Sequence, residues 1–293
     1  MSSPEFELIC APVTPIDDRD ELDLAATRRS FAWLRDAGVT RALVPGTTGE
    51  FVTLSDAERA RVLELALDVF GPQGVIAHIG AESSHHARAL AADAIRLGAT
   101  EFSAITPYYF PAGPHALTSY YTDLREAVGA HRLYAYVFSD RTGVVVPPPV
   151  LARLAASGSV DGVKLSGVPT RTVPDYQAVV PDGFRVYSGN DADLFELADA
   201  GAAGVVSGVS SVFPRPFVDA IGTLRRQGAR AEAVEELQAA VAAVSFGDIS
   251  ALKLAGSVQG LMSPAVRAAV EPLSEEARGA LLQYLSRPAP VAV

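Results

Sequence analysis

Amphipathic segments alternate along the chain with short segments that are almost entirely apolar. At four junctions an amphipathic stretch ends in a glycine and an apolar run follows; these glycines are Gly38, Gly98, Gly158 and Gly201. A glycine directly after a helix commonly adopts the left-handed conformation that ends the helix. The apolar runs are rich in Val, Ile and Ala, as parallel strands buried on both faces are. The pattern therefore predicts repeated βα units that form a parallel sheet.

Eight apolar runs are candidate strands, and they start roughly 20 to 35 residues apart. The candidates are Leu8–Ala11, Arg41–Val44, Val75–His78, Glu101–Ile105, Leu133–Phe138, Gly162–Leu165, Phe184–Tyr187 and Gly204–Ser207. Their number and spacing predict a (β/α)8 TIM barrel, an α/β fold, over residues 1–222. A dinucleotide-binding sheet needs a glycine-rich turn after its first strand, and LICAPVTP contains no glycine. Residues 223–293 have a helical pattern, and we expect a C-terminal helical extension that packs on the barrel as part of one structural unit.

Composition and charge exclude several classes of partner. The net charge is −10 and the pI is near 5.0, so the chain lacks the basic surface that nucleic acids require. No apolar run approaches the ~18 residues of a membrane span, and no leader with a basic and then an apolar region opens the sequence. Cys10 is the single cysteine and lies in an apolar run, so we expect a buried thiol and a cytoplasmic protein. The histidines do not follow a metal-binding pattern, and we expect neither a metal nor an organic cofactor.

Only two of the 24 basic residues are lysines, Lys164 and Lys253, and Lys164 lies inside the strand-like segment DGVKLSG. If Val163 and Leu165 face the helices, strand alternation directs Lys164 into the barrel. Desolvation there favours the neutral amine, which adds to ketone carbonyls and forms a Schiff base. The alternative is a lysine that extends to solvent or pairs with a carboxylate. Lys253 lies in an amphipathic helical segment, where we expect a structural or surface role.

Other predicted strands also end in residues suited to chemistry at the carboxyl end of a barrel. Thr47 and Thr48, in GTTGE, offer hydroxyl and backbone N–H donors that suit a carboxylate, although the turn could serve only to start a helix. Tyr136, near the end of the fifth strand, could move a proton to a substrate oxygen. A core tyrosine with a satisfied hydroxyl is the alternative, and Tyr108 and Tyr109 have the same two interpretations.

GTTGE, TPYY, a tyrosine near the end of the fifth strand with RTG after it, GVK and SGND occur in this order. Together they resemble the dihydrodipicolinate synthase / N-acetylneuraminate lyase family of class I aldolases, over about residues 6 to 265. The resemblance implies a TIM barrel with C-terminal helices, usually assembled as a homotetramer built from dimers. It implies a lyase in which a lysine forms a Schiff base with pyruvate or another 2-keto acid, which then reacts with an aldehyde.

The resemblance also assigns roles to individual residues. Lys164 matches the Schiff-base lysine, Tyr136 the tyrosine that shuttles protons, and Thr47 and Thr48 the pair that binds the keto-acid carboxylate and relays protons. Tyr109 matches a tyrosine that reaches the neighbouring subunit's site in the synthases. Arg141 matches the arginine that binds the carboxylate of the aldehyde partner in the synthases. As further substrate-binding candidates we take Gly46, before the threonine pair, and Ser207, at the end of the eighth strand.

The chain departs from the family pattern in three places. Val137-Phe138-Ser139 replaces a common segment of asparagine, a small residue and proline, and Leu165 replaces a commonly polar residue. Where lysine-inhibited synthases bind the inhibitor, this chain has Asp56, Arg59, Glu82 and His86, which match poorly, so feedback inhibition by lysine is not expected. Arg141 favours a dihydrodipicolinate synthase-like reaction. The altered strand end favours an aldolase or dehydratase of 2-keto-3-deoxy sugar acids. A barrel that only binds a keto acid, without catalysis, is the alternative from another class.

Overall fold

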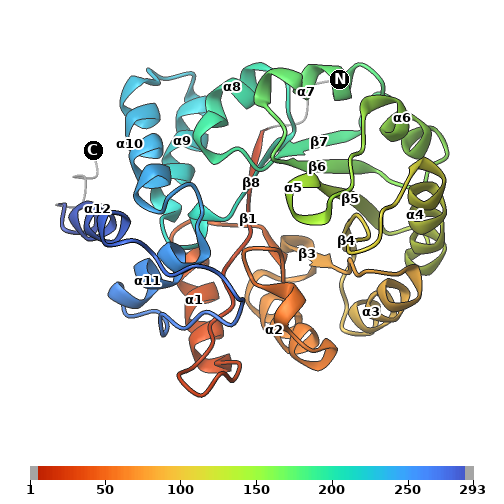
Figure 1. Ribbon diagram of the computed structural model, residues 1–293. Helices are drawn as coiled ribbons and strands as arrows, with labels where there is room; N and C mark the ends of the chain where they lie inside the picture. Colours follow the sequence, from red (N-terminus) through yellow and green to blue (C-terminus); the bar gives the residue numbers. More distant parts are fainter. Residues whose placement is uncertain (1–5, 288–293) are drawn as a thin grey trace.

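Eight parallel strands close into a barrel in chain order, β1 to β8, in a computed structural model that describes residues 6–287 (Figure 1). The strands are β1 (Glu7–Cys10), β2 (Ala42–Val44), β3 (Val75–His78), β4 (Glu101–Ile105), β5 (Arg132–Phe138), β6 (Gly162–Ser166), β7 (Arg185–Ser188) and β8 (Gly204–Ser207). The barrel closes because β8 pairs with β1, with Glu7 opposite Gly204 and Cys10 opposite Ser207. The predicted TIM barrel is therefore confirmed, and β3, β4 and β8 have the predicted bounds.

Helices surround the barrel and follow the strands along the chain (Figure 1). They are α1 (Leu24–Asp36), α2 (Asp56–Phe70), α3 (Ser84–Arg96), α4 (Pro114–Val128), α5 (Ser139–Thr142), α6 (Pro148–Ala156), α7 (Val173–Gln177), α8 (Leu194–Asp199) and α9 (Pro214–Arg226). The four glycines that end amphipathic segments all have positive φ, between 70° at Gly158 and 100° at Gly98. This left-handed conformation is the one predicted, and it ends each helix where the next strand must begin.

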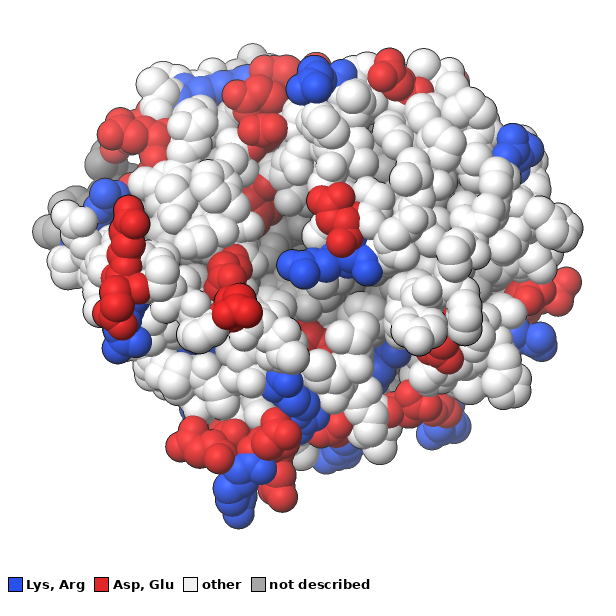
Figure 2. Space-filling view, in the orientation of Figure 1, with Lys and Arg blue, Asp and Glu red and all other residues white. Residues whose placement is uncertain are grey.

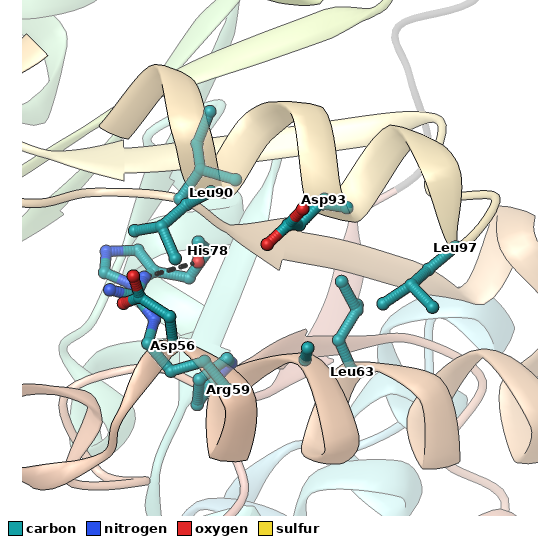
Figure 3. Close-up of a pocket in the computed structure, with 11 residues that line it drawn as sticks. Asp56, Arg59, Leu63, His78, Leu90, Asp93 and Leu97 are labelled. Carbon is teal, nitrogen blue, oxygen red and sulfur yellow. Dashed lines mark hydrogen bonds between the residues drawn. The ribbon is translucent and has the colours of Figure 1, made fainter. Parts of the chain in front are cut away.

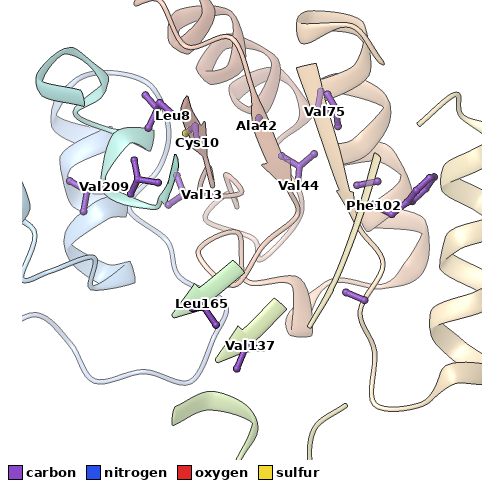
Figure 4. Close-up of a cluster of buried hydrophobic side chains, with 14 of the residues drawn as sticks. Leu8, Cys10, Val13, Ala42, Val44, Val75, Phe102, Val137, Leu165 and Val209 are labelled. Atoms are coloured by element: carbon purple, nitrogen blue, oxygen red, sulfur yellow. The ribbon is translucent and has the colours of Figure 1, made fainter. Parts of the chain in front are cut away.

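Strand alternation divides the apolar side chains into an outer core and a smaller inner one. Val137 and Leu165 occupy paired positions on β5 and β6 and point to the same side, in the outer core between strands and helices (Figure 4). Val163 belongs to the same outer core. Lys164 stands between two outward residues, so it faces the barrel interior, as predicted. The inner cluster comprises Ile9, Ala11, Leu43, Ile76, Tyr134, Tyr187, Ala203 and Val206.

Charged side chains meet inside the amino-terminal end of the barrel, where the strands begin. Arg41 bridges Glu7 at 2.9 Å and Glu101 at 2.5 Å. The Tyr187 hydroxyl donates to Glu7 at 2.6 Å, and the Tyr134 hydroxyl donates to Glu101 at 3.2 Å. Each buried charge therefore has a partner of opposite sign, as burial requires. This network, which we call the floor of the barrel, fills the end opposite to the strand termini that carry the predicted site.

The C-terminal extension consists of α10 (Ala231–Ala243), α11 (Ile249–Val258) and α12 (Glu275–Leu285), which lie together at the side of the barrel (Figure 1). Helix α9 crosses the predicted boundary at residue 222, and residues 288–293 of the predicted extension lie outside the described residues. Within residues 6–287, no helix has both the length and the apolar character needed to cross a membrane.

Lys253, in α11, is completely buried. Its Nζ lies 2.9 Å from Glu50 Oε1 in an ion pair, and it donates to the carbonyl oxygens of Thr14 at 2.6 Å and Ala265 at 2.9 Å. Burial lowers the pKa of Lys253, and the charge of Glu50 opposes this shift. The expectation of a structural role is met, whereas the surface alternative is wrong, because the helix packs this face against the loop that contains Glu50.

Candidate active site

Lys164 and Tyr136 occupy paired positions on the adjacent strands β6 and β5. Lys164 is 8% exposed, and its Nζ lies 4.0 Å from the centre of the Tyr136 ring. An amine in such a desolvated position can act as a nucleophile towards a carbonyl carbon once it is neutral. The two side chains that the sequence analysis places first among the catalytic candidates are therefore in direct contact inside the barrel.

Thr47 joins this pair through a hydrogen bond. Its Oγ1 lies 3.0 Å from the Tyr136 hydroxyl, and either oxygen can donate. The turn that carries Thr47 is fixed by backbone hydrogen bonds: Glu50 N donates to Thr47 O at 3.0 Å, and Phe51 N donates to Gly46 O at 3.3 Å. The hydroxyl pair gives a proton a path between the tyrosine and the turn.

The GTTGE turn (residues 46–50) is also fixed from outside the barrel. Glu50 adopts a left-handed conformation with φ 55°, and its Oε2 accepts hydrogen bonds from the backbone N–H groups of Arg267 at 2.9 Å and Ala268 at 2.6 Å. Ser55 then caps α2 in a reciprocal capping box with Glu58. The C-terminal extension therefore holds the last residue of the turn, and the start of α2 fixes the chain that follows it.

Gly208 and Gly189 have no side chain, and neighbouring side chains of the site occupy the space where their Cβ atoms would lie. A Cβ on Gly208 would lie 2.7 Å from Thr48 Oγ1, and a Cβ on Gly189 would lie 2.6 Å from Ser166 Oγ and 3.4 Å from Lys164 Cε. Real Cβ atoms do not approach other atoms at the two shorter distances, so any other residue would displace the threonine or the loop. Glycine after β7 and after β8 is therefore required by the packing of Ser166 and Thr48.

Asp191 follows β7 and is buried beside the site, and the sequence analysis did not single it out. Its Oδ2 accepts a hydrogen bond from Val209 N at 3.2 Å. Burial raises the pKa of Asp191 to about 7, while hydrogen bonding to Ser207 and Val209 and the charge of Lys164 act in the opposite direction. Ser207 is itself fully buried, and its Oγ accepts from Ser210 N at 2.9 Å. The only sequence signal for Asp191 is an acidic residue in the turn SGND after a buried strand.

Aromatic side chains form one wall beside Tyr136. Phe51 and Tyr136 pack with Ile105, and Tyr108 and Phe138 cover this group. The Phe138 ring is stacked on that of Tyr136, with centroids 6.3 Å apart. This wall is bulkier than the family pattern implies for the end of the fifth strand, because Phe138 stands where a small residue is common.

His78 is a second residue near the site that the sequence analysis did not select. Its ring lies edge-on to Phe51 and Tyr136, with centroids 4.5 Å and 6.0 Å away. Burial, assisted by the charges of Arg59 and Lys164, lowers the pKa of His78 well below its usual value. Arg59 Nη2 donates to the His78 carbonyl oxygen at 2.8 Å, in the seam where Arg59 and Leu63 of α2 face α3 (Figure 3). His78 is therefore a neutral part of the wall.

Three of the four residues expected near the inhibitor site, Asp56, Glu82 and His86, interact with one another. His86 Nε2 lies 2.8 Å from Asp56 Oδ1, and its Nδ1 lies 3.2 Å from Glu82 Oε2. These carboxylates raise the pKa of His86 against the effect of burial. Arg59 is buried behind them and stacks over the Phe51 ring, 5.3 Å from its centre. The carboxylates of Asp56 and Glu82 are therefore already paired with His86.

The mouth of the barrel is marked by Arg141 in the short helix α5. Figure 2 shows a hollow near the middle of this face, with a basic side chain across it and an acidic one beside it, at the place of α5 in Figure 1. Helix α5 contains Asp140 and Arg141, and the Arg141 guanidinium lies 5.8 Å from the centre of the Phe138 ring. Arg141 therefore lies in the segment that directly follows the carboxyl end of β5.

Tyr109 is the one catalytic candidate that lies outside the site of its own chain. It is 86% exposed, adopts φ 76° and contacts the neighbouring Phe110 ring at 5.0 Å. A positive φ is uncommon for a bulky residue, and here it turns the ring towards solvent. The site within this chain accordingly comprises Lys164, Tyr136 and the GTTGE turn, with Arg141 at the mouth. Within residues 6–287, no group of three or more His, Cys, Asp or Glu could hold a metal ion.

Comparison with known proteins agrees with this geometry. A model described as the dihydrodipicolinate synthetase family matches residues 5–287. The 4-hydroxy-tetrahydrodipicolinate synthase of Anaeromyxobacter sp. (strain Fw109-5) is 32% identical, covering 94% of this chain and 95% of the relative. A synthase of the same name, numbered 1, from Streptomyces coelicolor is 30% identical, covering 96% and 93%. The crystal structure of dihydrodipicolinate synthase from Thermotoga maritima superposes with a TM-score of 0.88 at 28% identity, covering 96% and 98%. The chain therefore belongs to the dihydrodipicolinate synthetase family.

Proposed function

We propose that this protein is a class I carbon–carbon lyase that joins pyruvate, or another 2-keto acid, to an aldehyde through a Schiff base on Lys164. The observation that carries the proposal is the contact between the buried Lys164 amine and Tyr136, whose hydroxyl lies 3.0 Å from Thr47 Oγ1. A nucleophile, a proton carrier and a hydroxyl relay are thereby connected in one place. Family membership and the names of the relatives support the same reaction class.

The mechanism follows from these positions. The neutral amine of Lys164 attacks the ketone carbon of the keto acid, whose carboxylate lies on the hydroxyl and N–H groups of Thr47 and Thr48. The Tyr136 hydroxyl donates the proton with which the carbinolamine hydroxyl leaves as water, and the resulting iminium withdraws electrons from the adjacent carbon. The Tyr136 phenolate, held by the Thr47 hydroxyl, then takes a proton from that carbon to give an enamine. The enamine then attacks the aldehyde carbonyl, and the new alkoxide takes a proton back from Tyr136.

Borohydride trapping tests the Schiff base directly. The protein is reduced in the presence of pyruvate and digested, and the peptides are analysed by mass spectrometry. We expect a pyruvate adduct on Lys164 and none on Lys253, which serves as an internal control because its amine is engaged by Glu50. The variant Lys164→Met should fold and form no adduct. Pyruvate binding without an adduct on Lys164 in the wild-type protein would refute the proposed function and support a binding-only role.

The aldehyde is proposed to carry a carboxylate. Arg141 lies at the mouth with its guanidinium over Phe138, where it can form a charge-assisted hydrogen bond to such a group. The relatives are named as synthases of this kind, which supports the synthase over a 2-keto-3-deoxy sugar acid aldolase or dehydratase. Turnover measured on both classes of substrate separates them, and Arg141→Gln should raise KM for the acidic aldehyde while pyruvate trapping stays unchanged.

We also propose a homodimer or homotetramer in the cytoplasm. Tyr109 and Phe110 are 86% and 73% exposed, and such an aromatic pair on a surface loop suits contact with a second copy. The single cysteine, buried and free, suits a reducing compartment. Sedimentation velocity tests the assembly: we expect a dimer or tetramer that Tyr109→Ala weakens. A monomer at micromolar concentration would contradict the proposed assembly. Monomers are possible for this fold, since one solved relative is described as a monomeric dihydrodipicolinate synthase variant.

A further inference from the structure

Glu50, the last residue of the GTTGE turn, has a backbone conformation that is uncommon for its residue type. Its φ is 55°, in the left-handed region that residues with a side chain seldom adopt. The backbone is bonded on both sides: Glu50 N donates to Thr47 O at 3.0 Å, and Glu50 O accepts from Thr53 N at 2.8 Å. A disfavoured conformation persists where the surrounding structure imposes it, and such residues cluster at functional sites.

The C-terminal extension binds the Glu50 carboxylate through both of its oxygens. Oε2 accepts from the N–H groups of Arg267 and Ala268 at 2.9 and 2.6 Å. Oε1 has no hydrogen-bond partner among residues 6–287, and its contact is the ion pair with Lys253 Nζ at 2.9 Å. Because the side chains of Glu50 and Lys253 are both 0% exposed, water cannot take the place of either partner. The ammonium therefore fixes the position of this carboxylate and of the end of the turn.

Lys253 also holds the loop that packs against the turn. Nζ donates to Thr14 O at 2.6 Å, in the loop after β1. The turn lies against this loop at Gly49, where a Cβ would be 2.9 Å from Thr14 Oγ1 and 3.0 Å from Pro12 O. The third contact of Nζ, to Ala265 O at 2.9 Å, is with the C-terminal extension. One buried ammonium thus joins the loop after β1, the turn after β2 and the extension.

The turn carries the hydroxyl that contacts the proton carrier of the proposed reaction. Glu50 N is bonded to Thr47 O, and Thr47 Oγ1 lies 3.0 Å from the Tyr136 hydroxyl. A continuous series of contacts, of 2.9 to 3.0 Å each, therefore runs from Lys253 in α11 through the turn to Tyr136 on β5. A displacement of about 1 Å at a reacting group can lower a rate about a hundredfold, even when its cause is remote.

We propose that Glu50 and Lys253 are positioning residues for catalysis, and that their ion pair holds the GTTGE turn where the Thr47 hydroxyl meets Tyr136. This inference rests on the proposed function. In that reaction Tyr136 gives up one proton and later takes another, and the Thr47 hydroxyl stabilises the intervening phenolate by donating to it. Without the ion pair, the extension no longer fixes the end of the turn. The two hydroxyls then separate and proton transfer slows, while the strands that carry the lysine and the tyrosine stay in place.

A double-mutant cycle between Lys253→Met and Thr47→Val separates positioning from a purely structural role. The assay is the exchange of pyruvate methyl protons with deuterium from D2O, followed by NMR at saturating pyruvate, because this exchange requires Tyr136 to move a proton. Each variant is measured below its melting temperature. We expect Lys253→Met to slow exchange about ten- to a hundredfold, while borohydride still traps pyruvate on Lys164. In the Thr47→Val background no hydroxyl remains to be positioned, so the same change should slow exchange by less than about threefold.

Leu281→Ala is the matched control for lost stability. Leu281 lies in α12 of the same extension and is 0% exposed, so its truncation leaves a cavity and lowers the melting temperature, and exchange should stay at the wild-type rate. If Lys253→Met does not fold, Glu50→Gln with Lys253→Met, which leaves no unpaired charge, replaces it in the cycle, and the same losses are expected.

Three results would overturn the inference. The first is an equal loss of exchange rate in the wild-type and Thr47→Val backgrounds. The second is a folded Lys253 variant that exchanges at the wild-type rate. The third is a loss of the same size in Leu281→Ala, which would make the effect one of stability. Absence of a pyruvate adduct on Lys164 in the wild-type protein refutes the proposed function itself.

Discussion

Removing the charge of Lys253 should destabilise the whole protein. This ammonium is shielded from water and makes three short contacts. Nζ lies 2.9 Å from Glu50 Oε1 and donates to the carbonyl oxygens of Thr14 and Ala265, and both charged side chains are 0% exposed. Lys253→Met leaves Glu50 buried without a counter-charge and two carbonyls without a donor. Breaking a buried ion pair in this way costs about 3–5 kcal/mol. At about 2–4 °C per kcal/mol, the melting temperature should fall by roughly 6–20 °C.

The double variant Glu50→Gln with Lys253→Met is the matched control. The double variant removes both charges. In the wild-type protein Glu50 accepts hydrogen bonds from the N–H groups of Arg267 and Ala268, and the amide oxygen of the glutamine can still accept them. Replacing both members of a buried pair leaves no uncompensated charge, so the part of the lost stability that comes from the unpaired Glu50 should return, while the carbonyls of Thr14 and Ala265 stay without this donor. Thermal and urea unfolding of the four proteins in the cycle give the coupling energy. A cost below about 1 kcal/mol for Lys253→Met, or a double variant as unstable as the sum of the single changes, would refute the reasoning.

Three further outcomes are expected. Tyr136→Phe should lower kcat with an aldehyde by about 10²–10⁴-fold, through loss of the proton carrier, while borohydride trapping still detects pyruvate on Lys164. If the trapped adduct fell by the same factor as kcat, the tyrosine would have another role. Gly189→Ala places a Cβ 2.6 Å from Ser166 Oγ, so urea unfolding should show a loss of about 1–3 kcal/mol, and unchanged stability would contradict the packing described. L-Lysine should leave initial rates unchanged up to millimolar concentration, since the carboxylates near its expected position already bind His86, and saturable inhibition would disprove this.

The sequence was sufficient for the barrel because the relevant signals are local. Alternation around Lys164 places Val163 and Leu165 outside, and glycines such as Gly38 adopt the left-handed conformation that ends a helix. Lys164 and Tyr136 could be found because each stands near the end of a buried strand, where a polar side chain is conspicuous. The family resemblance then supplied partners from other strand ends, including the threonine that the structure places against Tyr136.

Other features depend on contacts between distant segments and have weak local signals. Asp191 in SGND looks like an ordinary turn residue, and only the folded chain buries it and bonds it to Val209 N. Glu50 and Lys253 lie in separate elements, and each alone reads as a surface charge on a turn or a helix. The role that the family resemblance assigns to Tyr109 requires a second chain, so one folded chain could not position it at a site.

The floor of the barrel has a consequence for the order of events. Because Arg41, its two glutamates and the tyrosines interact across the amino-terminal end of the barrel, we expect substrates to reach Lys164 from the carboxyl end. For the proposed reaction, the water released during iminium formation must leave through the same entrance that the keto acid used, and the aldehyde must enter there afterwards. A shared entrance favours a fixed order in which the keto acid binds, water is released and the aldehyde binds last. Steady-state rates should then give parallel lines in double-reciprocal plots, the signature of a substituted-enzyme cycle.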